Sequence, residues 1–265
     1  MLVEQVVTFF LIGGLAGFAG GLFGIGGGII FVPSQILIYT LLGIPPFLQM
    51  KMAVATSLFA TACTTFTSAR AHSKHGAIIW KLIYKIAFGI TLGSLLGAYL
   101  ARILPGSVLK EIFGGGLCIL SVYLFFFAKP HDHETGHIPG FIPFNLVGMG
   151  VGTVSAMLGM SGGVMLVPAL MFFHQPIRKA VGTASGMGFL LAVIGVIGFI
   201  LPGFGQISYP YCFGYLYIPA LVPLALGSVL TARWGARLTH SLPLAILKKI
   251  FAIMLLAIGI LMMFH

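Results

Sequence analysis

Two glycine-rich breaks interrupt otherwise apolar segments of this sequence, and both contain groups that can bind an anion. The first reads GIGGG over residues 24–28, and the second reads GMSGG over residues 159–163. Glycine exposes backbone N–H groups, and a helix N-terminus carries unpaired N–H donors and a positive dipole end. We therefore predict that a small anion binds where the chain resumes after each break. The residues assigned to this site are Gly26, Gly27, Gly28, Ser161, Gly162 and Gly163.

Polar and basic side chains follow each break and extend the candidate site. They are Lys51, Thr56 and Ser57 in the first half, and Arg178, Thr183 and Ser185 in the second. The hydroxyls are of a kind that lines a polar pocket, and the cations are of a kind that attracts anions toward it. Helix capping and interfacial snorkelling explain the same residues. Both interpretations stay open.

Three further residues of the candidate site lie in the segments that resume after the breaks. Pro33 and Pro168 follow the breaks at equivalent positions and mark the resumed segments. Gln35 lies two residues after Pro33 and has Leu170 as its counterpart. Gln35 either makes the anion site asymmetric or bonds a neighbouring helix. The glycines of the breaks, likewise, either form the site or only allow helices to pack closely.

The composition is that of an α-helical integral membrane protein. Hydrophobic residues make up 59% of the 265 residues and charged residues only 7%, whereas soluble domains carry roughly 25%. The apolar runs are long and continuous, unlike the alternating strands of a membrane barrel. The net charge of +10 comes from residues at the ends of these runs. It therefore indicates membrane topology and contact with anionic lipid, and no nucleic-acid partner.

The positions of the acidic residues exclude several classes of function. The four acids are Glu4, Glu111, Asp132 and Glu134, and none lies in the interior of an expected span, because Glu111 is only the second residue of the span at 110–128. A carboxylate proton relay within the membrane is therefore excluded. Since no metalloprotease motif or acid pair is present, we expect no enzyme activity, cofactor or metal centre. The segment HDHETGH at 131–137 has the residue types of a metal site, but such linkers are more often simply polar.

The length of the uncharged segments requires the chain to fold back at each break. A straight helix over the uncharged residues 5–50 would be about 69 Å long, more than twice the roughly 30 Å hydrocarbon core. Residues 138–177 repeat this arrangement around the second break. Each segment is therefore predicted to form a broken helical hairpin. The other spans are expected at 52–70, 82–101, 110–128, 180–201, 217–238 and 245–264.

The chain is an internal duplication. An offset of 135 residues pairs Gly24 with Gly159 and Pro33 with Pro168. KMAVATS at 51–57 resembles RKAVGTA at 178–184, and GAYLARILPGSVLKEIF at 97–113 resembles GARLTHSLPLAILKKIF at 235–251. We divide the chain into a first transmembrane repeat at 1–128, a cytoplasmic linker at 129–137 and a second repeat at 138–265.

The basic residues predict that the two repeats are inverted. The connection at 70–85 carries four Lys and Arg residues, whereas its counterpart at 202–216 carries none. The first connection is therefore expected in the cytoplasm and the second outside. The predicted fold is all-α, with two inverted repeats, each a glycine-broken hairpin plus three helices, giving 8–10 transmembrane segments. Both termini are then expected outside a multi-pass plasma (inner) membrane protein.

The breaks with their prolines, the AVATS and AVGTAS runs, and the repeat ends around Leu104-Pro105 and Leu242-Pro243 resemble the TauE/SafE sulfite exporter family. The resemblance covers nearly the whole chain, which departs from the glycine pattern at Ser161. It implies a permease that exports sulfite, an organosulfonate or a related sulfur-containing anion. The expected partners are this anion and the lipid bilayer, with a homodimer left open. The alternatives are a permease for another organic anion and a membrane scaffold without a transport cycle.

Overall fold

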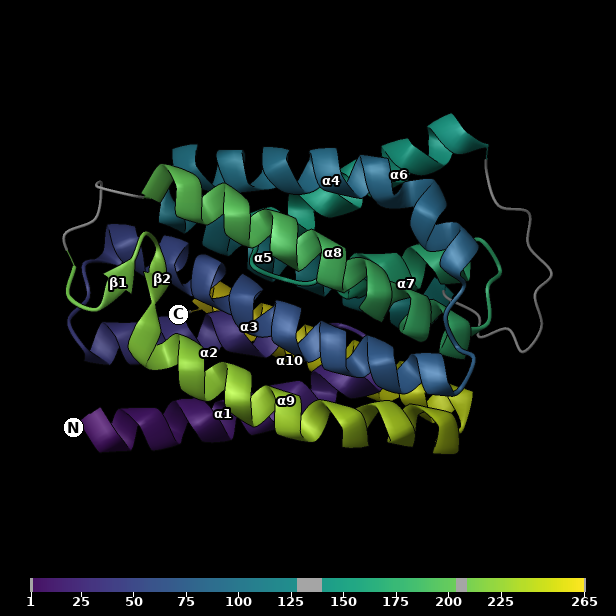
Figure 1. The fold of residues 1–265 in the computed structure, drawn as a ribbon, viewed down its shortest axis with the longest axis horizontal. Helices are drawn as coiled ribbons and strands as arrows, with labels where there is room; N and C mark the ends of the chain where they lie inside the picture. The colour runs from purple at the N-terminus through teal and green to yellow at the C-terminus, as the bar shows by residue number, and fades with distance from the viewer. Residues whose placement is uncertain (1, 128–139, 204–208, 265) are drawn as a thin grey trace.

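The computed structural model describes residues 2–127, 140–203 and 209–264, and in this part of the chain it is almost entirely helical (Figure 1). In the first half the elements are α1 (Leu2–Phe23), α2 (Gly28–Leu41), α3 (Pro46–Lys74), α4 (Trp80–Ile103), α5 (Gly106–Val122) and the π-helical turn η1 (Tyr123–Phe127). In the second half they are α6 (Phe141–Met157), α7 (Gly163–Phe172), α8 (Ile177–Gly203), β1 (Cys212–Phe213), β2 (Leu216–Tyr217), α9 (Ile218–Ser241) and α10 (Leu244–Phe264). The strands form one short antiparallel hairpin, in which Cys212 pairs with Tyr217. The linker predicted at 129–137 lies outside the described residues.

The first break lies where the sequence predicts it. Helix α1 ends at Phe23 and α2 begins at Gly28. Between them Gly24, Gly26 and Gly27 have φ angles of 71°, 67° and 84°, which only glycine adopts readily. Helix α2 then runs back toward the end of the bundle at which α1 begins (Figure 1). The predicted fold-back is confirmed.

The second break repeats this geometry with shorter helices. Helix α6 ends at Met157, Gly159 has a φ of 73°, and α7 begins at Gly163. Helix α6 starts at the end of the bundle opposite to the start of α1, and α7 runs back toward it (Figure 1). Ser161 replaces the glycine found at position 26, where φ is positive.

Seven helical segments of the described chain are long and apolar enough to cross a membrane. They confirm an all-α, multi-pass membrane protein. Helices α2 and α7 are shorter, with 14 and 10 residues, or about 21 Å and 15 Å at 1.5 Å per residue. Since neither can span a core of roughly 30 Å, the end of each helix that adjoins a break lies inside the bundle.

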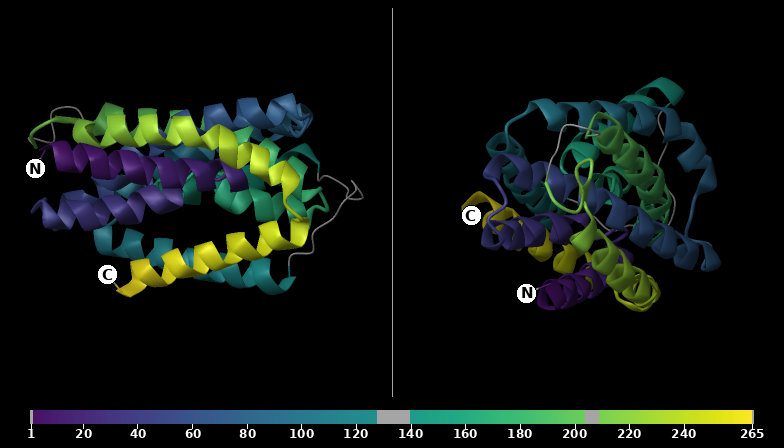
Figure 2. Two further views of the ribbon diagram at one scale, coloured as in Figure 1. Left: turned by 90° about the horizontal axis from the view of Figure 1, so that it is seen from below. Right: turned by 60° about the vertical axis from the view of Figure 1, so that its left-hand side comes forward.

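The basic residues gather at one end of the bundle. Helices α3 and α9 end there, and α4, α8 and α10 begin there (Figures 1 and 2). The residues near these termini are Arg70, Lys74, Lys81, Lys85, Arg178, Lys179, Arg233, Arg237, Lys248 and Lys249. The opposite end has Lys51, Arg102 and Lys110. By the positive-inside rule the first end is expected in the cytoplasm, and this orientation stays a prediction. Lys129 lies outside the described residues.

Two helix pairs with closely spaced backbones connect the halves. Helix α1 packs mainly against α9, and α4 packs mainly against α6. Glycines at every fourth position form both contacts, and a Cβ on any of them would collide with the partner backbone. These glycines are Gly13, Gly17 and Gly21 in α1, and Gly89, Gly93 and Gly97 in α4. Under the sequence repeat α1 corresponds to α6, so each half packs its first helix against the other half. The inverted relation of the repeats stays a prediction.

Candidate anion site at the paired helix breaks

The two breaks, 135 residues apart in the sequence, are in direct contact. A Cβ added at Gly28 would lie 2.5 Å from the carbonyl oxygen of Gly159. A Cβ added at Gly163 would collide with the carbonyl oxygen of Gly24. Each helix that resumes after a break therefore starts against the break of the other half. Residues 24–28 and 159–163 are all buried.

Serine hydroxyls from α3 and α8 lie beside these contacts. Ser57 Oγ donates a hydrogen bond of 2.8 Å to the Gly159 carbonyl. Ser185 Oγ lies 3.1 Å from the position of a Cβ on Gly24, bonds the Val181 carbonyl, and is 3.2 Å from Ser68 Oγ. The structure thus places both predicted serines beside the breaks, each next to the break of the opposite half.

The first N–H groups of α2 and α7 converge on this contact. Gly28 and Gly163 are the first residues of these helices, and the first N–H groups of a helix have no intrahelical acceptor. Among the described residues, no backbone carbonyl accepts a hydrogen bond from the N–H groups of Gly26–Gly28 or Ser161–Gly163. Two helix dipoles therefore present their positive ends at one buried place.

Two buried hydroxyls at the breaks have no hydrogen-bond partner. Thr61 Oγ1 and Ser161 Oγ are both without a partner within the described chain, and both residues are fully buried. Thr61 Oγ1 lies 3.2 Å from the position of a Cβ on Gly28, and Ser161 Cβ lies 3.0 Å from that of a Cβ on Gly26. Since a buried hydroxyl without a partner is unfavourable by about 1–3 kcal/mol, this pair indicates a place for a ligand.

The sequence interpretation identified Ser161 and missed Thr61. Ser57, Thr61 and Thr65 lie at spacings of four on α3, so they share one face of that helix. Ser68 and His72 continue this buried polar face, and His72 Nε2 is 3.1 Å from the Gly21 carbonyl at the end of α1. The sequence signal that could have identified Thr61 was this row of polar residues at helical spacing within an otherwise apolar span. A third buried hydroxyl, that of Ser155, also has no partner in the described part.

Thr56 and Thr183 each bind the start of a helix in the other half. The Tyr217 backbone N–H donates a 3.0 Å hydrogen bond to Thr56 Oγ1, and the Ile79 N–H donates an equal bond to Thr183 Oγ1. Tyr217 and Ile79 immediately precede α9 and α4. The two bonds are equivalent under the repeat and give these threonines a role in joining the halves.

Gln35 is fully hydrogen-bonded within the protein. Its Nε2 donates to the carbonyls of Phe31 and Ala53 at 3.2 and 3.4 Å, and its Oε1 accepts from the Tyr39 hydroxyl at 2.7 Å. These bonds connect α2 to α3. Pro33 and Pro168 are buried inside α2 and α7, where each removes one backbone donor from the helix.

The two predicted basic residues lie at opposite ends of the bundle. Lys51 Nζ donates a 2.7 Å hydrogen bond to the Arg102 carbonyl, and the Arg178 guanidinium is 3.4 Å from the Leu242 carbonyl. Both bonds are exposed. The structure therefore brings the glycines and serines of the prediction together but places these cations near the two membrane surfaces.

No group of three metal-binding side chains occurs in the residues that the structure describes. The histidine-containing segment at 131–137 falls outside them. The groups that meet at the breaks are hydroxyls and backbone N–H groups, which are neutral hydrogen-bond donors.

Comparison with known proteins identifies the family of the chain. The family model described as sulfite exporter TauE/SafE matches residues 9–262. The chain belongs to this family. It is a family of membrane transporters and not of enzymes.

Two relatives of this TauE/SafE chain match it over nearly its whole length. A probable membrane transporter protein of Haemophilus influenzae is 33% identical over 253 residues, covering 94% of this chain and 95% of the relative. The probable membrane transporter protein MJ0441 of Methanocaldococcus jannaschii is 27% identical over 256 residues, with 96% and 93% coverage. No solved structure is significantly similar to the chain. The protein is thus a multi-pass membrane transporter.

Proposed function

We propose that this transporter exports a small sulfur-containing oxyanion, sulfite or an organosulfonate, and holds it where the two breaks meet. The observation that carries the proposal is the pair of buried, unpartnered hydroxyls of Thr61 and Ser161 beside the first residues of α2 and α7. Hydroxyl and backbone N–H donors at two helix N-termini are groups that bind an oxyanion. A bound oxyanion would supply the acceptors that these donors lack.

The breaks would stabilise an anion with helix dipoles and neutral donors, an arrangement that suits an anion that must also be released. Within the described residues, the basic side chains lie toward the ends of the helices, so the charge of a bound anion is stabilised by helix dipoles and neutral donors. Such stabilisation is weaker than that of a fixed, buried ion pair. The anion is therefore held specifically and can still be released.

Transport requires the two halves to separate at the breaks. Both breaks are buried, and their backbones are in direct contact. In transporters built from broken helices, the repeats rock about a central site and open it to either side in turn. We infer that this structure corresponds to the closed stage of that cycle. The two halves would then move relative to each other at the α1–α9 and α4–α6 contacts.

The choice of a sulfur-containing anion rests on the description of the family. Backbone N–H groups and hydroxyls bind carboxylates as well as sulfur oxyanions, so the geometry also suits a permease for another small organic anion. That permease is the second candidate function. A scaffold without transport does not account for two unpartnered hydroxyls at the meeting point of two helix ends.

Transport by the purified protein tests the substrate class. We expect proteoliposomes that contain the protein to exchange radiolabelled sulfite far faster than empty liposomes. Unlabelled sulfite or sulfoacetate should compete for the exchange, and acetate should not. Competition by acetate alone would favour the second candidate, and failure of every anion in a panel with sulfate, thiosulfate and taurine would contradict the proposal.

A further inference from the structure

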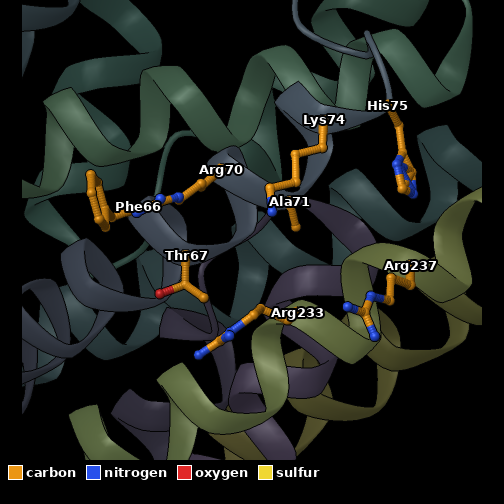
Figure 3. Close-up of a pocket in the computed structure, with 8 residues that line it drawn as sticks. All are labelled: Phe66, Thr67, Arg70, Ala71, Lys74, His75, Arg233 and Arg237. Atoms are coloured by element: carbon orange, nitrogen blue, oxygen red, sulfur yellow. The ribbon is translucent and has the colours of Figure 1, made fainter.

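A pocket lined by four basic residues lies between α3 and α9, near the end of the bundle assigned to the cytoplasm. Arg70 and Lys74 come from α3, and Arg233 and Arg237 come from α9 (Figure 3). The cavity has a volume of about 430 Å³. Its other lining residues include the ring of Phe66 and the imidazole of His75. The transport site proposed above uses none of these residues.

The positive charge of this pocket is not neutralised by the described protein. Within the part of the chain that the structure describes, the carboxylates are those of Glu4, in the first turn of α1, and Glu111, near the start of α5. Both helices begin at the opposite end of the bundle (Figures 1 and 2). Four cations in one cavity repel one another, and a bound anion would reduce this repulsion because its charge is opposite.

The pocket is also continuous with an apolar surface. Arg70 and Arg233 lie one helical turn, or about 6 Å, farther from the end than Lys74 and Arg237. Phe66 on α3 is 52% exposed, and Leu230 on α9 is 54% exposed, each about one turn deeper still. Trp234, at 60% exposure, is of the residue type that marks the membrane interface. The charged groups therefore lie nearer the end of the bundle and the apolar side chains deeper, which is the order of the headgroup and acyl chains in a lipid.

We propose that this basic pocket is a second anion site, which binds the phosphate group of an anionic phospholipid. The arginines provide planar, forked donors that pair with two phosphate oxygens at once, and Lys74 adds a mobile charge. The acyl chain lies along Phe66 and Leu230. Basic pockets between membrane helices on the cytoplasmic side bind lipid headgroups in this way. Because α3 also carries Ser57 and Thr61, a bound lipid would brace the helix that lines the transport site.

Thermal unfolding in lipid nanodiscs tests the proposal. We expect phosphatidylglycerol to raise the Tm by about 3 °C or more over phosphatidylcholine alone. The double variant Arg70→Gln/Arg233→Gln should lose most of this rise. The matched control Arg102→Gln/Lys110→Gln, which removes two cations from the opposite end, should keep it. A rise of equal size in the first variant would overturn the proposal, as would no rise in the unmodified protein.

Three further arms distinguish the source of the phosphate, guard against misfolding and separate the lipid site from the transport site. Glycerol phosphate and inorganic phosphate are added to phosphatidylcholine nanodiscs, and a Tm rise from either, equal to that from phosphatidylglycerol, would overturn the lipid assignment. Lys74→Gln/Arg237→Gln should also weaken the rise, which covers the case that the first variant does not fold. A Thr61→Val variant should keep the full lipid-dependent rise, because the proposal does not rest on the transport site.

Discussion

Replacing Thr61 by Val and Ser161 by Ala together is expected to stabilise the free protein and to abolish anion-dependent stabilisation and transport. Each substitution removes a buried hydroxyl without a partner, which in the free state is unfavourable by about 1–3 kcal/mol. With anion bound, each hydroxyl becomes a donor to a charged group, a bond that contributes about 1.5–3 kcal/mol. Its loss lowers affinity by about 10- to 100-fold per hydroxyl. The Tm with and without sulfite, measured beside radiolabelled sulfite exchange, checks both effects.

Thr8→Val serves as the matched control for this prediction. The Thr8 hydroxyl is exposed near the start of α1 and bonds the Glu4 carbonyl. Its removal should leave the sulfite-dependent rise in Tm and the exchange rate unchanged. A double variant that is less stable than the unmodified protein yet still responds fully to sulfite would show that the two hydroxyls are structural.

Two adjacent glycines at the start of α7 should differ strongly in how much stability the same substitution costs. In Gly163→Ala the new methyl group would collide with the backbone carbonyl oxygen of Gly24, so the two breaks must separate. We expect a loss of stability of about 3 kcal/mol or more and loss of transport. In Gly162→Ala the methyl group would lie 3.1 Å from Leu191 Cδ1, the end of a flexible side chain, and φ is −52°. We therefore expect a change in stability below about 1 kcal/mol.

Size-exclusion chromatography and thermal unfolding of the two alanine variants measure this difference directly. The pair is well matched because both positions lie in the same turn and gain the same methyl group. Equal stability of the two variants would show that the breaks do not pack as the structure has them. A stable Gly163→Ala protein with full transport would also contradict the role of this contact in the cycle.

The sequence was sufficient to locate the breaks because their physical cause is local. Uncharged segments too long for one membrane crossing must fold back, and clustered glycines allow the positive φ angles seen at Gly24 and Gly159. The helical spans also follow from local composition. Their observed ends extend beyond most of the expected ones by a few residues, since capping turns such as Pro45 before α3 carry little hydrophobic signal.

The partners of the polar residues were not predictable, because they depend on contacts across the fold. Thr56 bonds a backbone group 161 positions away, and Thr183 one that is 104 positions away. Thr61 differs from neighbouring threonines such as Thr65, which bonds the Thr61 carbonyl, only in having no partner. The convergence of Arg70 and Arg233 in one pocket likewise depends on the packing of α3 beside α9. Sequence alone placed these residues at span ends and gave no reason to join them.

The most direct test of the anion site is a crystal structure of the protein with selenite, a heavier analogue of sulfite. Selenium scatters anomalously, so its position is measured without assumptions about the ligand. We expect an anomalous peak between the two breaks, with selenite oxygens about 2.6–3.2 Å from Thr61 Oγ1 and Ser161 Oγ. A peak confined to the basic pocket between α3 and α9, or to any other place away from the breaks, would contradict it.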